Sequence, residues 1–320
     1  MNYRRLGRTG LDVSEIGLGT WALGSAVYGE VEKDAPERLV KGAIDKGINL
    51  FDTAPLYGTK EVDGVSESIL GTALGADRDS VLISTKFGRT SSDVIPGRFY
   101  AKEARVSCEA SLRRLGTDRL DILFFHSPFK PEEINDDVWE ELAKLKAEGK
   151  VRFLGHSVSL YQDTADMSAQ WMADRRIDVV QVVLSPFNRE ARPLIKTAID
   201  CDCGVVAREC LSNGFLSGAI KEDTVFPKGS LNARYSQAEI AERVAYANQL
   251  AEAMIQGEVK TLPQAAYRWV LDQPGVSLAL SGAKDLSELI DPVIASSCSS
   301  FDSTIQESVE DMHVQDFGAA

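Results

Sequence analysis

Eight short apolar segments alternate with helical patterns along this chain, and that alternation constrains its fold more than any other feature. The segments, each interpreted as a buried strand, are Glu15–Trp21, Ile48–Asp52, Val81–Lys86, Leu120–His126, Val151–Ser157, Ile177–Leu184, Val205–Glu209 and Val276–Ser281. Short runs of Ile, Leu, Val and Phe between turn residues are typical of strands in a parallel sheet. Eight strand–helix repeats within 320 residues predict an α/β fold, a closed (β/α)8 TIM barrel.

The intervening segments carry apolar residues at helical spacing, as Leu39, Val40, Ala43 and Ile44 do in the first of them. The predicted helices cover residues 35–46, 64–75, 101–116, 135–149, 160–173, 190–202, 236–256, 262–273 and 285–295. Residues 211–275 hold two of these helices between the last two strands, which predicts extra helices and loops at the C-terminal face of the barrel.

The two ends of the chain lie outside the repeat. Residues 1–14 contain two short stretches around a Gly7–Gly10 turn, which predicts an N-terminal β-hairpin. The tail, residues 296–320, is rich in Ser and acidic residues and lacks strong periodicity, so it is either partly mobile or folded back over the barrel mouth. Because no low-complexity linker interrupts the chain, residues 1–320 are predicted to form a single domain.

Charge and cysteine content narrow the class of partner. Asp and Glu outnumber Lys and Arg by 48 to 35, for a formal charge of −13. Nucleic acids and anionic membranes bind basic surfaces, so neither is an expected partner. The five cysteines include no CxxC pair and are predicted to be reduced. With neither an apolar leader nor a bilayer-length apolar run, the expected location is cytoplasmic, and the oligomeric state is left open.

Ionisable side chains follow three consecutive strands at the point where each strand ends. Asp52 ends one strand, Lys86 the next and His126 the third, while Tyr57 lies in the loop after Asp52. Alone, Asp52 and Lys86 could form a structural ion pair, Tyr57 could be a loop aromatic and His126 a core histidine. Because ligands bind at the carboxyl ends of parallel strands, their joint placement instead favours one catalytic group.

These side chain types suit proton transfer to a carbonyl oxygen. A Lys ammonium beside a phenol stabilises the phenolate, and a carboxylate beside the Lys keeps it charged and oriented. A neighbouring His can orient the carbonyl. Tyr57 would then act as a general acid while a hydride reaches the carbon atom. Three His residues without ligand spacing predict no metal site.

Five stretches in order, GLGTW, FDTAPLYG, STKFG, SLRRLGTDRLDILFFHSP and GKVRFLGHS, give the chain a specific resemblance to the aldo-keto reductases. The resemblance runs from about residue 3 to residue 295. It implies an NAD(P)(H)-dependent oxidoreductase that transfers a hydride between nicotinamide C4 and a carbonyl or alcohol. Asp52, Tyr57, Lys86 and His126 match the family's catalytic tetrad, with Tyr57 as the proton donor.

The resemblance also implies a set of cofactor contacts without a Rossmann fingerprint. Ser157 and Gln181 would hold the nicotinamide carboxamide, and Arg208 would pack on its ring. The remaining implied contacts are Leu211, Gly214, Leu216 and Ser217 at the pyrophosphate, Gly282, Lys284 and Glu288 at the adenosine end, and Thr20, Trp21 and Asp52 elsewhere along the cofactor. NADP(H) is favoured by the family's habit and NAD(H) is the alternative, because Lys284 suits a 2′-phosphate and Glu288 opposes one.

Small aldehydes and ketones are the expected substrates, with a substrate pocket formed by Trp21, Tyr28, Tyr57, His126 and Phe129. The DTAPLYG stretch is also similar to members that oxidise aldoses, so a sugar remains an alternative. Two other functions are open. One is a regulatory barrel that binds the cofactor with little turnover, and the other is a lyase or isomerase that uses Lys86 as a Schiff-base nucleophile.

Overall fold

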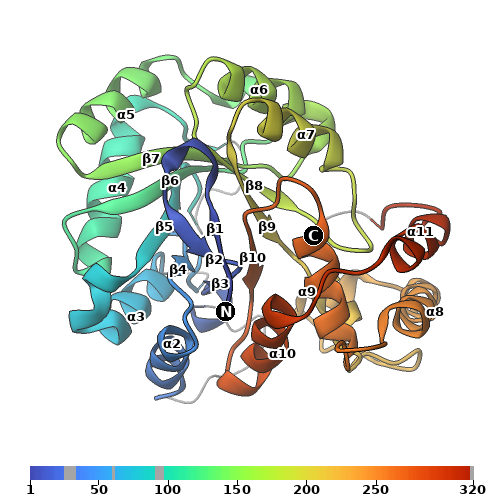
Figure 1. The fold of residues 1–320 in the computed structure, drawn as a ribbon. Coiled ribbons are helices and arrows are strands. Elements are labelled where there is room, and N and C mark those ends of the chain that lie inside the picture. Colours follow the sequence, from blue (N-terminus) through green and yellow to red (C-terminus); the bar gives the residue numbers. More distant parts are fainter. Residues whose placement is uncertain (25–33, 60–61, 91–96, 318–320) are drawn as a thin grey trace.

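Eight parallel strands close into a barrel in the order of the chain (Figure 1). The structure is a computed structural model that describes residues 1–24, 34–59, 62–90 and 97–317. The barrel strands are β3 (Ile16–Gly19), β4 (Leu50–Asp52), β5 (Leu82–Phe87), β6 (Leu120–His126), β7 (Val151–Ser157), β8 (Val179–Val183), β9 (Gly204–Arg208) and β10 (Leu278–Ser281). The predicted (β/α)8 fold is therefore confirmed.

The helices form an outer ring because each buries one apolar face on the strands. In the first long helix, for example, Leu39, Val40 and Ala43 are fully buried. The ring consists of α2 (Ala35–Asp45), α3 (Val65–Leu74), α4 (Ala101–Leu115), α5 (Asp137–Ala147), α6 (Tyr161–Ala173), α7 (Arg192–Asp200), α9 (Leu262–Asp272) and α10 (Leu286–Ser297), with a single-turn α1 (Trp21–Gly24) after β3. Among the described residues, no helix has both the length and the apolar character to cross a bilayer.

A small antiparallel hairpin, β1 (Tyr3–Arg5) and β2 (Asp12–Ser14), closes the amino end of the barrel, as predicted. A short 3-10 turn, η1 (Gly7–Thr9), joins its strands. Leu6 and Val13 of the hairpin segment are fully buried and pack into the barrel interior with Leu50 and Phe124. Gly7 has φ +49°, and a Cβ there would lie 2.3 Å from the nitrogen of Gly204, so the hairpin presses directly on the start of β9. The open end of the barrel is the opposite one.

The long segment between β9 and β10 contains four elements. They are two 3-10 turns, η5 (Ser212–Ser217) and η6 (Leu231–Arg234), followed by α8 (Gln237–Met254) and α9. Figure 1 shows α8 outside the ring, beside a last helix, α11 (Ser303–Asp311). Two further 3-10 turns, η3 (Gly75–Ser80) and η4 (Pro131–Glu133), lie in loops.

The tail forms a helix that we did not predict from the sequence. Asp302 caps α11 by accepting a hydrogen bond from the Ile305 N–H at 2.9 Å. Val309 is fully buried, and Ile305 and Met312, four positions before it and three after, pack against the same core, so a short apolar stripe at helical spacing was present but was not recognised. After α11, the Phe317 N–H donates to the Phe187 carbonyl at 3.3 Å, which places the end of the described tail on the loop that follows β8.

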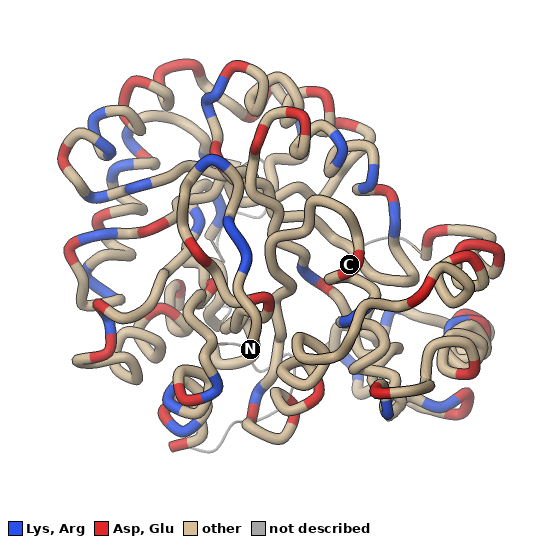
Figure 2. The backbone as a smooth tube through the Cα atoms, in the orientation of Figure 1, with Lys and Arg blue, Asp and Glu red and all other residues tan. Residues whose placement is uncertain are grey.

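Charged side chains of both signs alternate over the outer helices (Figure 2). One example is Arg105 of α4, which pairs with Glu148 at 2.7 Å and also with Glu109 and Glu141. All five cysteines are free thiols. Burial raises the pKa of the Cys108 and Cys203 thiols to about 12, so these two are unreactive structural side chains.

His156 lies in β7 next to Ser157, and its side chain points out of the barrel toward α6. Its ring lies 5.2 Å from that of Trp171, it is fully buried, and among the described residues neither ring nitrogen has a hydrogen-bond partner. Burial lowers the pKa of His156 to about 3. The imidazole is therefore neutral in the folded protein at neutral pH.

Acid is expected to destabilise the protein through His156. The unfolded imidazole has a pKa of about 6.5, so between pH 6.5 and 3 only the unfolded chain takes up this proton. Above pH 6.5 the neutral His156 does not reduce the free energy of unfolding. By pH 5, proton uptake by the unfolded chain lowers that free energy by about 2 kcal/mol. Urea unfolding at pH 7.5 and pH 5 measures how far the free energy of unfolding falls between these pH values. We expect this fall to be about 2 kcal/mol smaller in His156→Leu than in wild type. An equal loss in both proteins would contradict this assignment.

Candidate active site

The four predicted catalytic residues meet at the carboxyl end of the barrel. Asp52 ends β4, Lys86 lies near the end of β5 and His126 ends β6. The register pairs Asp52 with Ser84, two positions before Lys86, so alternation along β5 directs Ser84 and Lys86 to the same interior face. Tyr57 comes from the loop after β4, at the same end of the barrel.

Lys86 is the centre of this group. It is fully buried, and its Nζ donates to Asp52 Oδ2 at 2.6 Å, to the Thr53 carbonyl at 2.9 Å and to the Tyr57 hydroxyl at 3.1 Å. These three contacts match the three N–H groups of an ammonium. Burial lowers the pKa of Lys86, but the interactions with Asp52 and Tyr57 outweigh burial and leave the pKa above its ordinary value. Lys86 is therefore a permanent cation beside the phenol.

Asp52 is held in place by neighbours on both sides. Its Oδ1 accepts hydrogen bonds from Ser84 Oγ at 2.7 Å and from Gln181 Nε2 at 3.0 Å, while its Oδ2 faces Lys86. The side chain is almost completely buried. This geometry leaves the carboxylate one orientation, in which it points Lys86 toward Tyr57.

The His126 ring lies against Tyr57 and is uncharged. The two rings meet edge to face, with centroids 5.9 Å apart and planes at 86°. Burial holds the pKa of His126 well below its ordinary value, and the cations Lys86, Arg208 and Arg89 lower it further. Among the described residues, its Nδ1 has no hydrogen-bond partner. His126 therefore brings a neutral imidazole, with one N–H donor, to the site.

Ser157 and Gln181 continue the polar chain from Asp52 across the barrel mouth. Ser157 Oγ donates to Gln181 Oε1 at 3.0 Å, and Gln181 Nε2 donates to Asp52. Both side chains are buried. An amide has two N–H groups and two lone pairs, so these bonds use one of each and leave one donor and one acceptor. That pair matches the donor and acceptor of a carboxamide, and the donor set fits the nicotinamide group expected there.

Arg208, at the end of β9, is clamped beside these residues. Its guanidinium pairs with Glu209, and its Nη2 donates to the Val158 carbonyl at 3.2 Å and to Ser159 Oγ at 2.8 Å. Burial lowers the pKa of Arg208, while Glu209 and Tyr161 raise it to a value above the ordinary one. Its Nε is buried without a hydrogen-bond partner among the described residues. The guanidinium plane is therefore fixed at the mouth.

The expected pyrophosphate loop has an unusual backbone. Leu211 precedes η5, and Ser212, Asn213 and Gly214 have φ angles of +47°, +55° and +92°. Leu211 has φ −100° and ψ 11°, near the right-handed region, and is followed by the left-handed Ser212; a right-handed residue followed by a left-handed one is the backbone conformation of an anion-binding nest. A Cβ on Gly214 would meet only Ile220, at 3.5 Å, so the loop has room beside it. Within η5, Leu216 is fully buried, whereas Ser217 Oγ donates to the Gly214 carbonyl at 2.6 Å.

The expected adenosine contacts follow β10. A Cβ on Gly282 would meet nothing within 4 Å, so space is available there. The Lys284 N–H donates to Glu288 Oε2 at 3.0 Å, and the Lys284 ammonium lies 3.7 Å from Glu288 Oε1. Both side chains are nearly half exposed. Lys284 therefore attracts an anionic ligand at this end of the site, and Glu288 repels it.

The remaining predicted residues differ in where they lie. Thr20 is fully buried, and its hydroxyl contacts the Asp52 carbonyl at 3.0 Å and Ser66 Oγ at 2.6 Å, so it supports the site from below. The Trp21 ring lies 6.2 Å from that of Tyr57. Phe129 lies in the loop after β6. Tyr28 lies outside the described residues.

The structure adds a buried ion pair that the sequence pattern missed. Arg89 Nε donates to the His126 and Ser127 carbonyls, both at 2.9 Å, and its Nη2 pairs with Glu133 at 3.0 Å. The guanidinium lies 3.8 Å from the centroid of the Phe129 ring. Arg89 therefore fixes the backbone after His126 and one wall of the mouth. Arg89 lies two residues beyond the end of β5, which marked it as a residue of the mouth but gave no sign of its partners.

Comparison with known proteins agrees with this site. The Aldo/keto reductase family model matches residues 15–310. The aldo-keto reductase YhdN of Bacillus subtilis is 31% identical, over 90% of this chain and 87% of its own length. The L-galactose dehydrogenase of Arabidopsis thaliana is 41% identical over 160 residues, 48% of each protein. The structure of the glycerol dehydrogenase AKR11B4 of Gluconobacter oxydans superposes with a TM-score of 0.78 at 29% identity, covering 94% of this chain and 92% of the other.

No group of three or more His, Cys, Asp or Glu among the described residues is placed to hold a metal ion. The site instead combines a buried ammonium, a phenol and a neutral imidazole beside an amide that can hold a carboxamide. Together with the match to almost the whole chain, this shows that the protein belongs to the aldo/keto reductase family of NAD(P)-dependent oxidoreductases.

Proposed function

We propose that the protein transfers a hydride between nicotinamide C4 and a carbonyl or alcohol carbon, with Tyr57 as the general acid and base. The observation that carries this proposal is the buried chain from Asp52 through Lys86 to Tyr57, with contacts of 2.6 and 3.1 Å. It places a permanent cation against the phenolic oxygen and leaves that phenol at the open end of the barrel.

The cofactor, when bound, supplies the hydride. The protein supplies the proton and the orientation. In the reductive direction the Tyr57 hydroxyl gives its proton to the substrate oxygen, and Lys86 stabilises the phenolate that remains. Asp52 keeps Lys86 charged during this step. In the oxidative direction the phenolate accepts the proton from the alcohol. Positioned proton transfer of this kind contributes about 10²–10⁴ in rate.

His126 orients the substrate oxygen in this proposal. Because the imidazole is neutral, it donates one hydrogen bond without adding a second charge beside Lys86. Its contact with the Tyr57 ring brings that donor next to the phenolic acid. Arg89, which binds the His126 carbonyl, fixes the backbone that carries the ring.

The proposed cofactor contacts follow the order of the neighbouring strands β7, β8, β9 and β10 at their carboxyl ends. Ser157 and Gln181 would bind the carboxamide, Arg208 would pack on the nicotinamide ring, and Thr20, Trp21 and Asp52 would complete that end. The η5 loop, with Leu211, Gly214, Leu216 and Ser217, would take the pyrophosphate. Gly282, Lys284 and Glu288 would contact the adenosine. Phosphate sites after strands seven and eight are common in such barrels, which supports placing the pyrophosphate at η5 after β9, the seventh barrel strand.

We propose NADP(H) as the preferred cofactor over NAD(H). Lys284 supplies the cation that a 2′-phosphate needs, and Glu288 weakens its effect at 3.7 Å. Glu288→Gln keeps an acceptor for the Lys284 N–H but removes the negative charge. An exposed charge interaction of this kind amounts to at most about 1 kcal/mol, so we expect NADPH to bind about fivefold more tightly in this variant.

Fluorescence titrations with NADPH and NADH measure this effect. NADH lacks the 2′-phosphate, so its dissociation constant should not change in Glu288→Gln, and it is the matched control. Equal tightening of both cofactors would contradict the assignment of Glu288 to the 2′-phosphate. Equal or tighter NADH binding by the wild type would overturn the preference for NADP(H).

Small aldehydes and ketones are the proposed substrates, and an aldose oxidised to its lactone is the second candidate. Two similar proteins are an L-galactose dehydrogenase and a glycerol dehydrogenase, which supports testing polyols and sugars. Trp21, Tyr57, His126 and Phe129 would form walls of the substrate pocket, with Tyr28 as a further candidate. We further propose a single domain in the cytoplasm, where the free cysteines would stay reduced.

The geometry argues against Lys86 as a Schiff-base nucleophile. A nucleophilic lysine must be neutral, and its pKa is lowered for that purpose. Lys86 instead has a raised pKa and contacts three acceptors. A regulatory barrel with little turnover remains the competing function, since it would need the same cofactor site.

Nicotinamide absorbance, followed with NADPH or NADP⁺ and a panel of aldehydes, ketones, polyols and sugars in both directions, tests the proposal. Turnover would establish the oxidoreductase and identify its substrate. Tight NADPH binding without turnover on any substrate would favour the regulatory barrel. A covalent adduct trapped by borohydride with substrate would favour the Schiff-base reaction.

A further inference from the structure

The η5 loop rests on a cluster of aromatic side chains outside the barrel. Phe215, in the middle of η5, is almost fully buried, and its ring packs against Tyr235 at 5.5 Å and Phe226 at 6.4 Å. Arg243 of α8 lies over the rings of Tyr235 and Phe215, at 4.3 and 5.7 Å from their centroids. Because Arg243 is itself buried, it forms the floor on which this loop lies.

The end of the tail reaches the same arginine from the other side. The Phe317 ring lies 4.8 Å from Arg243, whose Nη2 donates to the Phe317 carbonyl at 2.9 Å. The same ring packs on Phe187 at 4.8 Å and on Tyr246 at 5.7 Å. Asp316 accepts a hydrogen bond from the Arg189 N–H at 2.5 Å. Residues 313–317, which we name the tail clasp, therefore bind both Arg243 and the loop after β8.

That loop is in turn tied to η5. Ser185 Oγ lies 2.7 Å from Ser212 Oγ, and Ser212 Oγ donates to Asn188 Oδ1 at 3.4 Å. Among the described residues, the buried Asn188 Nδ2 has no hydrogen-bond partner. The tail clasp thus contacts η5 through two routes, one through Arg243 and one through residues 185–189.

We propose that the tail clasp positions η5 for the dinucleotide, with Phe317 acting through Arg243. The proposal rests on the proposed function, which assigns η5 to the pyrophosphate. The left-handed conformations of Ser212 and Asn213 are strained for residues that carry a side chain, so η5 keeps this backbone only while its surroundings hold it. The buried contacts of Phe215 and Arg243 hold the backbone of η5 in this conformation, and the tail clasp holds Arg243 in place.

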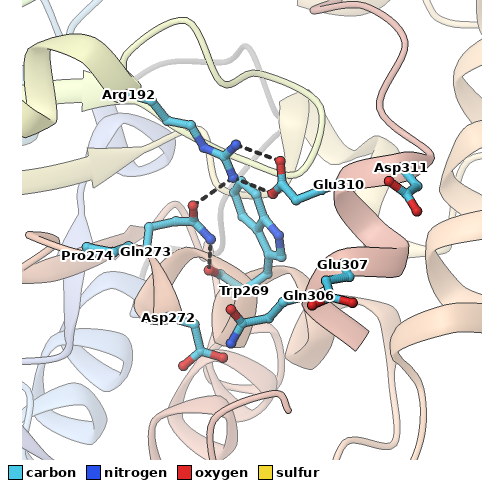
Figure 3. Close-up of a pocket in the computed structure, with 9 residues that line it drawn as sticks. All are labelled: Arg192, Trp269, Asp272, Gln273, Pro274, Gln306, Glu307, Glu310 and Asp311. Atoms are coloured by element: carbon cyan, nitrogen blue, oxygen red, sulfur yellow. Dashed lines mark hydrogen bonds and ion pairs between the residues drawn. The ribbon is translucent and has the colours of Figure 1, made fainter. Parts of the chain in front are cut away.

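Ion pairs help to attach the helix that precedes the clasp to the outer face of the barrel. Glu310 of α11 pairs with Arg192 at 2.6 Å and with Arg189 at 3.0 Å. Figure 3 shows Arg192 reaching both carboxylate oxygens of Glu310 and the side chain of Gln273. A cavity of about 380 Å³ lies along this seam. Changes in the clasp should therefore leave the barrel itself folded.

Two measurements on the full chain test the proposal. One is the dissociation constant for NADPH by fluorescence titration, and the other is amide hydrogen exchange of peptides covering residues 212–217 in the cofactor-free protein. The variants are Phe317→Ala, Arg243→Gln and their double mutant. Val314→Ala is the matched control, because Val314 lies in the same segment and is 85% exposed.

We expect Phe317→Ala and Arg243→Gln each to raise the NADPH dissociation constant about tenfold, a typical coupling between two sites, and to speed exchange in η5. In the double mutant, the NADPH dissociation constant should rise by clearly less than the product of the two single effects, because both changes break the contact between Phe317 and Arg243. At saturating NADPH, kcat should stay within about twofold of wild type, and Val314→Ala should match wild type throughout.

Wild-type affinity and exchange in Phe317→Ala would overturn the proposal. Additive effects in the double mutant would overturn the route through Arg243. Failure of wild type to bind NADPH would contradict the proposed function instead. The exchange measurement needs no cofactor, so it distinguishes these two failures.

Discussion

Tyr57→Phe is expected to lower kcat about 10³-fold, within the range for loss of a positioned proton donor. The change removes only the hydroxyl that lies 3.1 Å from Lys86 Nζ. It keeps the ring that packs between Trp21 and His126, so we expect the cofactor dissociation constant to stay within about twofold of wild type. Steady-state turnover in both directions, with a fluorescence titration of NADPH, measures both quantities.

Tyr3→Phe is a suitable control for this variant. It removes a phenolic hydroxyl at the opposite end of the barrel, where the Tyr3 hydroxyl donates to the Gly47 carbonyl at 2.7 Å. Its turnover should match that of wild type. Equal turnover in wild type and Tyr57→Phe would mean that another group donates the proton.

Lys86→Met is expected to destabilise the protein by about 3–5 kcal/mol, because it leaves the buried Asp52 carboxylate without its cation. The Lys86 and Asp52 side chains are 1% and 4% exposed, so water cannot replace the lost partner. Adding Asp52→Asn removes the stranded charge and should restore most of this stability. Neither variant has the ammonium that stabilises the phenolate, so both should lose at least about 10² in kcat.

Urea unfolding and steady-state turnover of the two variants separate structure from chemistry. Recovery of stability without recovery of activity is the expected pattern. If activity returned with stability in the double mutant, the ion pair would be structural only, and the proposed role of Lys86 in catalysis would be wrong.

The barrel could be predicted because its signals are local. Each strand is a short apolar run between turn residues, and each ring helix has a buried face that periodicity reveals. The meeting of Asp52, Lys86 and His126 followed from the same signals, because parallel strands deliver their carboxyl ends to one place. Helix α11 was missed although its signals are also local: Asp302 caps it, and Ile305, Val309 and Met312 recur at helical spacing.

Other features depend on distant segments and have no local pattern. The ion pair of Arg89 and Glu133 joins residues 44 positions apart in the chain. The contact of Arg243 with Phe317 joins residues 74 apart. His156 is a different case. Once Ser157 is assigned to the barrel interior, alternation along β7 directs His156 outward to the helices, so its position could be predicted from the sequence.

We propose above that the Tyr57 phenol, held by Lys86, is the proton donor, and this role can be tested directly. Replacing Tyr57 with a ring-fluorinated tyrosine keeps the ring and the hydroxyl but makes the phenol more acidic. The measurement is the single-turnover rate of NADPH oxidation against pH, for this variant and for wild type. We expect the loss of reductive activity at alkaline pH to move to lower pH in the fluorinated protein. An unchanged pH profile would show that the phenol of Tyr57 does not supply the proton.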